Sequence, residues 1–161
     1  MSELQSNLLT EGLQKGFGEG TNFQITERGS FKLTSSHYIS EDGGIYHDEW
    51  VIGGGQELVR NTNGETLTRT YVGNVVSSER LEAVGISEKE ILIFLKKIII
   101  EYGSQTRFNT DFESIFENWK YSYKVTYKEK DPFIINGIEK IFYKGNSVFT
   151  HTFGISKVIE T

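Results

Sequence analysis

The chain has 161 residues, no cysteine and a formal net charge of −5. This length is typical of one domain and is long enough to bury about 70% of the unfolded surface, so residues 1–161 are expected to form a single globular domain. The absence of cysteine excludes a disulfide framework, a thiolate zinc site and a cysteine nucleophile. No secretory signal or bilayer-length apolar run is recognisable, which predicts a soluble cytoplasmic protein with no membrane partner.

The first elements are a helix and a polar segment. Leucines at helical spacing in residues 3–15 predict an amphipathic N-terminal helix: Leu4, Leu8, Leu9 and Leu13. The three following glycines are expected to end it: Gly16, Gly18 and Gly20. Residues 21–29 are polar and are expected to form a loop.

Two hairpins are predicted next. Residues 31–40 and 45–52 are typical of strands joined at Asp42-Gly43, a favourable two-residue turn. Residues 56–61 and 65–72 predict a second hairpin around Asn63-Gly64. The glycine run 53–55 between them is followed by no lysine and opens no helix, so it predicts a bulge or bend rather than a phosphate loop.

The second half begins with a capping box, Ser87 followed by Glu90, which predicts a helix over residues 88–102. Its side chains are apolar nearly all round, so it is expected to pack in the concavity of a curved sheet. Residues 103–117 show no regular pattern. Residues 119–128 alternate as a strand, and residues 138–143 and 147–155 predict a closing hairpin around Gly145-Asn146. The fold class is therefore α+β, with a curved, mainly antiparallel sheet of about six or seven strands, an N-terminal helix and one long buried helix.

The first hairpin suggests a polar pair. If Asp42 and Gly43 alone form the turn, His37 lies opposite Asp48 on an aromatic face with Tyr46 and Trp50. Such a pair anchors a ligand, orients a base or simply satisfies two buried groups. A shift of the turn by one residue dissolves the pair.

Other chemistries find less support. The three histidines lack a metal-ligand spacing, and His151, between Phe149 and Phe153, is interpreted as a core residue. Lysines alternate with tyrosines along residues 119–128 and therefore lie on the opposite strand face, which does not make a nucleic-acid platform. The acidic first half also disfavours nucleic acid. We expect no metal, no cofactor and no nucleic acid partner, and a homodimer is left open.

Scattered residues along most of the chain resemble an uncharacterised bacterial domain family, found alone or behind a helix-turn-helix of the XRE regulator type. The resemblance rests on the following positions: Tyr46-x-Asp48, Gly53–Gly55, Glu57, Val59, residues 69–73, Arg107, Tyr121-x-Tyr123, Phe133, Gly137-x-Glu139-x-Ile141, Gly145, Val148 and Phe153-x-Ile155. The leucine-rich first helix and the apolar helix 88–102 fit as well. The resemblance implies an α+β domain and, by analogy, a sensing or dimerising module. No helix-turn-helix precedes it here, so we expect no DNA binding.

Three functions remain. The first is non-catalytic binding or sensing of a small molecule in a concave sheet pocket, with six ligand-binding residues: His37, Tyr46, Asp48, Trp50, Glu57 and Tyr71. The alternative is a protein-interaction module, such as an immunity, antitoxin or phage-encoded inhibitor protein. The third is a hydrolase-like enzyme using His37 and Asp48.

Overall fold

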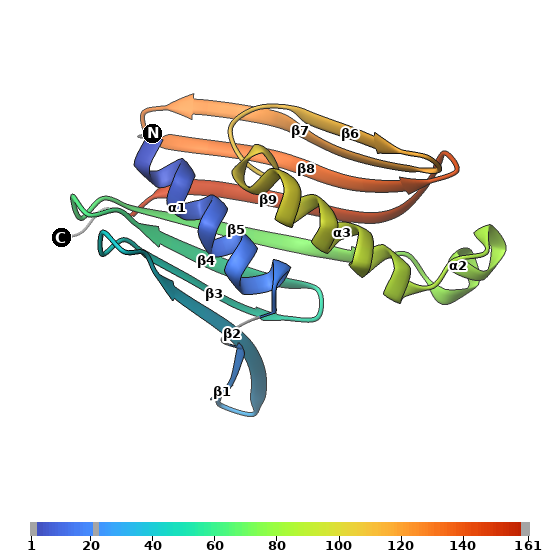
Figure 1. Ribbon diagram of the computed structural model, residues 1–161, viewed down its shortest axis with the longest axis horizontal. Helices are drawn as coiled ribbons and strands as arrows, with labels where there is room; N and C mark the ends of the chain where they lie inside the picture. The colour runs from blue at the N-terminus through green and yellow to red at the C-terminus, as the bar shows by residue number, and fades with distance from the viewer. Residues whose placement is uncertain (1–2, 21–22, 159–161) are drawn as a thin grey trace.

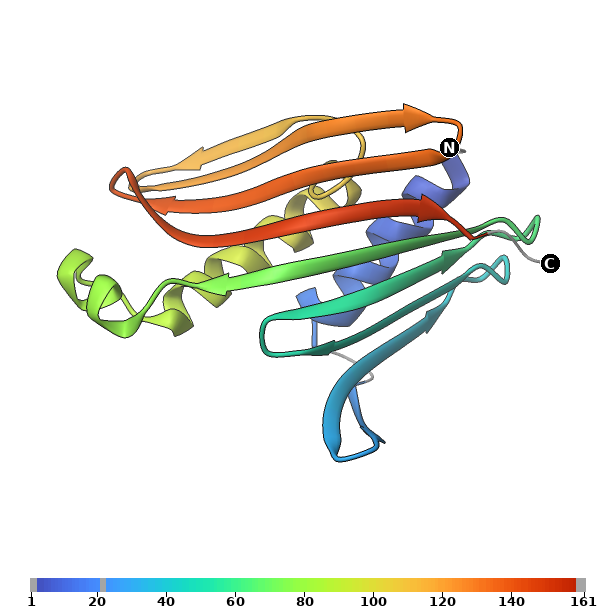
Figure 2. The same ribbon diagram turned by 180° about the vertical axis from the view of Figure 1, so that it is seen from behind.

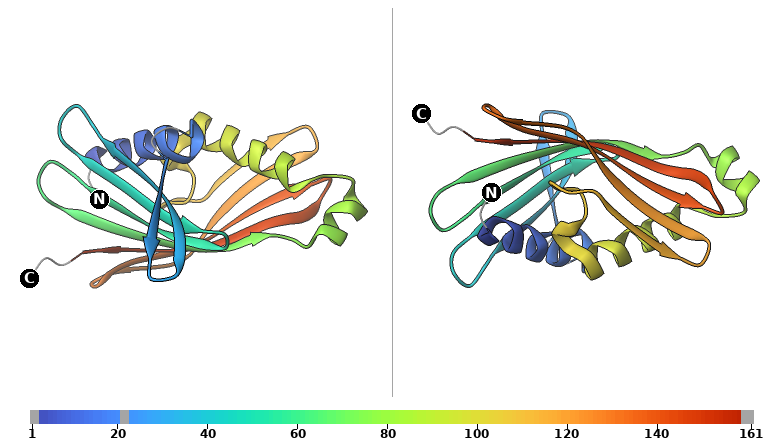
Figure 3. Two further views of the ribbon diagram at one scale, coloured as in Figure 1. Left: turned by 90° about the horizontal axis from the view of Figure 1, so that it is seen from below. Right: turned by 90° about the horizontal axis from the view of Figure 1, so that it is seen from above.

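A single antiparallel sheet of nine strands organises the described residues, 3–20 and 23–158 of the computed structural model, in the order β1-β2-β3-β4-β5-β9-β8-β7-β6. Figure 1 shows α1 and α3 crossing one face of this sheet, and Figure 2 shows the opposite face uncovered by any helix. Seen along the sheet in Figure 3, the strands curve around both helices. The α+β class and the curved sheet are confirmed, but six or seven strands was too few.

Three α-helices and nine strands form this structure in the described residues. The helices are α1 (Glu3–Leu13), α2 (Ser78–Val84) and α3 (Glu88–Tyr102). The strands are β1 (Phe23–Arg28), β2 (Phe31–Ile39), β3 (Ile45–Val51), β4 (Gly54–Arg60), β5 (Thr66–Val75), β6 (Phe112–Phe116), β7 (Trp119–Lys130), β8 (Phe133–Tyr143) and β9 (Asn146–Lys157). None of the helices in this part of the chain is long and apolar enough to cross a bilayer.

The sequence predicted that the glycines after α1 end the helix. This prediction is wrong. A π-helical turn, η1 (Gln14–Gly18), continues directly from α1, and only Gly20 has a positive φ of 67°. Gly16 serves close packing instead, because a Cβ there would lie 2.6 Å from the Ser36 hydroxyl oxygen. The longer helical segment carries Phe17 over the concave face. The Leu4 side chain lies outside the described part of the structure.

The helix α3 begins and ends as predicted. The Ser87 hydroxyl accepts from the Glu90 amide and the Glu90 carboxylate accepts from the Ser87 amide, which completes the capping box. One side of α3 is buried on the sheet, but Ile93 and Ile100 are exposed, so the helix is not covered all round. The short helix α2 was not predicted.

Two strands were also missed. The predicted loop over residues 21–29 contains β1, and its first two residues lie outside the described part of the chain. The irregular stretch 103–117 contains β6. Both are edge strands, hydrogen-bonded on one side only. An edge strand buries little of either face, so its sequence carries a weak alternation.

The predicted register of the first hairpin is wrong by one residue. The turn spans five residues, with the Ser40 amide donating to the Gly44 carbonyl at 2.9 Å, so His37 pairs with His47 and Ser36 pairs with Asp48. Because a one-residue slip reverses the two faces, His37 lies exposed on the convex side and Asp48 is buried on the concave side. The closing hairpin turns at Lys144-Gly145, one residue before the predicted position.

Candidate functional site: a pocket in the concave face

Buried ionisable side chains form a row across β3, β4 and β5 on the concave face. Asp48 on β3 pairs in register with Glu57 on β4, and Glu57 pairs with Arg69 on β5. All three are at least 95% buried, with exposed fractions of 5%, 1% and 0%. Residues in register on neighbouring antiparallel strands lie within contact distance, so strand pairing alone brings two carboxylates and a guanidinium together.

Glu57 and Arg69 form the first ion pair of this row. Arg69 Nη1 lies 2.8 Å from Glu57 Oε2, and the Tyr46 hydroxyl donates to Glu57 Oε1 at 2.9 Å. Arg69 Nη2 donates to the Arg107 carbonyl at 2.8 Å, which ties the loop after α3 to the sheet. A buried guanidinium with these partners has its charge compensated by Glu57 and its position fixed by the loop.

Glu139 on β8 is the centre of the second cluster. Its Oε1 accepts from Arg107 Nε at 2.6 Å and from the Tyr121 hydroxyl at 2.7 Å, and its Oε2 lies 3.4 Å from His151 Nδ1. Burial by itself raises the pKa of a carboxyl, but the Arg107 guanidinium and then His151 outweigh burial and lower the pKa of Glu139 to about 2. Glu139 is therefore ionised at neutral pH.

Asp48 has a different environment. Its nearest partner is the Tyr71 hydroxyl, which donates to Oδ1 at 3.2 Å. Burial raises the pKa of the Asp48 carboxyl well above its ordinary value, and the neighbouring Glu57 carboxylate raises the pKa further. The hydrogen bond from Tyr71 and the more distant arginines act in the opposite direction without overcoming burial.

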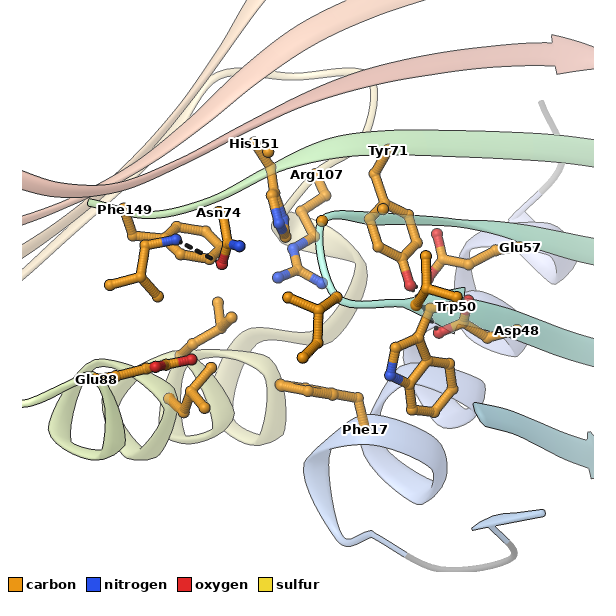
Figure 4. Close-up of a pocket in the computed structure, with 18 of the residues that line it drawn as sticks. Phe17, Asp48, Trp50, Glu57, Tyr71, Asn74, Glu88, Arg107, Phe149 and His151 are labelled. Atoms are coloured by element: carbon orange, nitrogen blue, oxygen red, sulfur yellow. Dashed lines mark hydrogen bonds between the residues drawn. The ribbon is translucent and has the colours of Figure 1, made fainter. Parts of the chain in front are cut away.

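These charged clusters border a pocket of about 210 Å³ between the sheet and the helices. In Figure 4, Trp50, Asp48, Glu57 and Tyr71 lie on one side, and His151, Phe149 and Asn74 lie towards the other. The helical segments supply the opposite wall through Phe17, Leu92 and Leu95. Gly55 leaves room for these rings, since a Cβ there would lie 2.5 Å from the Tyr71 hydroxyl oxygen.

Arg107 is the cation that faces this pocket. Figure 4 shows its guanidinium directed into the pocket beside His151. Its backbone has a φ of 61°, in the left-handed region that non-glycine residues seldom adopt. Such a conformation costs about 1–3 kcal/mol and persists where the surroundings hold it, here the Arg69 and Glu139 contacts. Strain of this kind is often found at functional sites.

Four of the six sequence-predicted ligand residues line the pocket: Asp48, Trp50, Glu57 and Tyr71. Tyr46 is fully buried beneath α1 and does not line the pocket, but its hydroxyl donates to Glu57, which does. His37 lies on the opposite face, where its ring centroid is 5.7 Å from that of His47. The predicted pairing of His37 with Asp48 is therefore wrong, and the hydrolase hypothesis loses its proposed base.

Several pocket residues were missed. His151 was interpreted as a core residue, yet it lines the pocket and contacts Phe149, with ring centroids 4.3 Å apart. Glu139 alternates with Ile135, Gly137 and Ile141 on the inward face of β8, so an acid in an apolar row was an available signal of a buried charge. Nothing in the local pattern around Arg107 indicated that it meets Glu139, 32 positions away.

The glycine run forms a hairpin turn, in agreement with the expected bend. Val51 pairs with Gly54, which leaves Ile52 and Gly53 as the turn, and Gly53 has a φ of 102°. Gly54 and Gly55 continue into β4 and line or border the pocket. Among residues 3–20 and 23–158, no group of three or more His, Asp or Glu side chains is arranged to hold a metal ion.

The structure thus belongs to the class of curved antiparallel sheets that hold a pocket between their concave face and covering helices. No protein-family model, no curated protein and no solved structure matches the chain.

Proposed function

We propose that this protein binds a small organic molecule, without catalysis, in the pocket between the concave sheet face and the helices. One observation carries the proposal: an apolar pocket contains a few convergent polar groups, namely the Arg107 guanidinium, the Asp48 carboxyl and the Tyr71 hydroxyl. Apolar walls with a small number of fixed polar groups are the usual composition of a ligand site.

The size of the pocket limits the ligand. Its volume of about 210 Å³ is below the range of about 300–1,000 Å³ typical of drug-sized ligands. It exceeds the cavity of about 150 Å³ that accommodates benzene in an engineered protein. The ligand is therefore expected to be a single ring or a branched chain of similar size with one polar group.

A screen of small metabolites by thermal unfolding tests this function. A ligand present at about 100 times its dissociation constant stabilises the native state by about 2.7 kcal/mol. We expect Leu92→Trp, which places an indole at the pocket wall, to abolish the stabilisation by any ligand found. Ile93→Trp is the matched control, because the next residue of α3 is 57% exposed and lies outside this pocket.

The proposal fails if no compound of this size stabilises the protein, or if Leu92→Trp and Ile93→Trp respond to the ligand as the parent protein does. Both variants are compared with the parent protein by circular dichroism, so that loss of binding is separated from loss of the fold.

Protein interaction is a second candidate function, favoured by the β1–β2 hairpin. Figure 3 shows this hairpin bending away from the rest of the sheet, and Ile25 and Phe31 on it are 68% and 72% exposed. The register places these two side chains on opposite faces of the hairpin, so each face exposes an apolar group that a partner would cover. Sedimentation of the parent protein and of Ile25→Thr/Phe31→Thr tests self-association, and a monomer at every concentration would rule out the homodimer form of this candidate.

A further inference from the structure

Arg107 presents two hydrogen-bonding groups to the pocket that no described residue accepts. Its side chain is hydrogen-bonded within the described part of the chain through Nε alone, to Glu139. The residue is only 7% exposed, and Figure 4 shows both Nη atoms directed into the pocket. Among the described residues neither Nη group has a hydrogen-bond acceptor, so solvent or a ligand in the pocket accepts from them.

We propose that the ligand is a small organic anion whose carboxylate is bound end-on by the two Nη groups of Arg107. The proposal rests on the proposed binding function and names the ligand class. A planar guanidinium holds a carboxylate through two parallel N–H···O bonds, which adds direction as well as energy. Because Nε of Arg107 already donates to Glu139, the two Nη groups remain available to the ligand.

Arg107 is fixed before any ligand arrives. Glu139 holds Nε at 2.6 Å, and Arg69 holds the backbone carbonyl at 2.8 Å. The guanidinium carbon also lies 5.4 Å from the centroid of the Phe153 ring, a cation–π contact. A side chain fixed in this way loses little conformational freedom when it binds a ligand, which favours affinity.

The acids around the pocket do not oppose an anion. Glu57 is compensated by Arg69, and Glu88 is exposed at the end of α3, where water and salt screen it. Burial raises the pKa of the Asp48 carboxyl and so acts against its charged form. Its Tyr71 partner is already in place. The Nη groups of Arg107 are therefore the cationic donors in the pocket to which an anion would bind.

The rest of the pocket selects the body of the ligand. Trp50 and Phe149 on the sheet and Phe17 and Leu92 on the helices form its apolar wall. Aromatic rings of this kind favour a flat ring or a branched aliphatic group. The structure therefore points to a compact aromatic or branched-chain carboxylic acid.

Three compounds that share a benzene ring and differ in the charge of the polar group test the ligand class: benzoate, benzamide and benzylamine. Each is titrated into the full chain, and binding is followed by calorimetry and protein NMR. We expect benzoate to bind at least tenfold more tightly than benzamide, and benzylamine to bind most weakly. Equal or tighter binding of benzamide or benzylamine would overturn the anion assignment and leave the binding function standing. Failure of all three probes, together with an empty metabolite screen, would remove both.

The contact with Arg107 is tested in two ways. Arg107→Lys keeps the charge but loses the planar fork, so we expect benzoate affinity to fall at least tenfold while benzamide affinity hardly changes. Leu92→Trp should abolish the binding of both benzoate and benzamide. Should Arg107→Lys fail to fold, the side-chain NMR signal of Arg107 Nε–H in the parent protein replaces it. This signal should shift with benzoate, while the signal of the exposed Arg28 stays unchanged, and an unmoved Arg107 signal at saturation would overturn the proposal.

Discussion

The two ends of the buried charge network hold carboxyls with opposite behaviour. Asp48 and Glu139 are both at least 95% buried on the concave face, on β3 and β8. The pKa of Asp48 is raised well above its ordinary value, and that of Glu139 is lowered to about 2. Burial has the same sign at both residues, because it always penalises the charged form of a carboxyl.

The difference therefore arises from the partners. Glu139 receives Arg107, Tyr121 and His151, at 2.6, 2.7 and 3.4 Å. Asp48 receives one neutral hydroxyl at 3.2 Å and has Glu57, another acid, in the next strand. A directly bonded cation outweighs desolvation, whereas a single neutral donor does not. Of these two acids, Glu139 is held in an ion pair, and Asp48 lines the pocket.

The largest effect on stability is expected from Glu139→Gln, which removes the ion pair between Arg107 and Glu139. Removing the carboxylate leaves Arg107 buried without its counter-charge, which costs about 3–5 kcal/mol of unfolding free energy. Urea unfolding at neutral pH measures the loss. Lys140→Gln is the control, because it changes the neighbouring residue on the other face of β8.

The same variant has a defined pH dependence. The pKa of Glu139 is about 2 in the folded state and about 4.3 in an unfolded chain. Its stabilisation is therefore complete above the unfolded value and disappears as the pH falls through the folded value. The gap between the parent protein and Glu139→Gln should shrink below about pH 4, and a gap that stays constant would contradict the lowered pKa.

Asp48→Asn should change the free energy of unfolding in the opposite direction to Glu139→Gln, and by a smaller amount. A carboxyl with a raised folded pKa contributes most stability at low pH and loses it as the pH rises from about 3.9, the unfolded value, through the folded one. The amide does not titrate and still accepts from Tyr71. We expect a gain on the order of 1 kcal/mol at pH 7 that vanishes in acid, measured by urea unfolding across pH. A variant that is less stable at neutral pH, with a difference that disappears in acid, would mean that Asp48 is ionised and paired.

The smallest effect on stability is expected at Glu113, an exposed acid that serves as a comparison for the two buried ones. Glu113 on β6 contacts Lys120 and Lys124 at 3.2 and 3.4 Å, and its side chain is 39% exposed. The hydrogen bond from Lys120 lowers its pKa, as in an ion pair. Ion pairs in water contribute little because solvent screens them. Glu113→Gln should therefore leave the urea midpoint unchanged, and a clear loss would show that this edge of the sheet is more ordered than its exposure indicates.

Local chemistry was sufficient for several elements. Ser87 and Glu90 mark the start of α3, and Asn63-Gly64 lies in the turn between β4 and β5, because a cap or a tight turn depends on neighbouring residues only. The edge strands β1 and β6 were missed, since half-exposed strands show weak patterns. The hairpin around Asp42 was misread by one residue, because its turn uses Ser40 and Gly44 as well.

The sequence by itself determined the α+β class, the presence of the β2–β3 and β4–β5 hairpins, the long helix and four of the residues that line the pocket. It did so because hydrophobic period, caps and turns are short-range properties of the chain. The tertiary structure alone decided that Arg107 meets Glu139, that Arg69 meets Glu57, and that His37 and Asp48 face opposite ways. These outcomes depend on strand register and on a loop that packs across the sheet, and no local pattern encodes either.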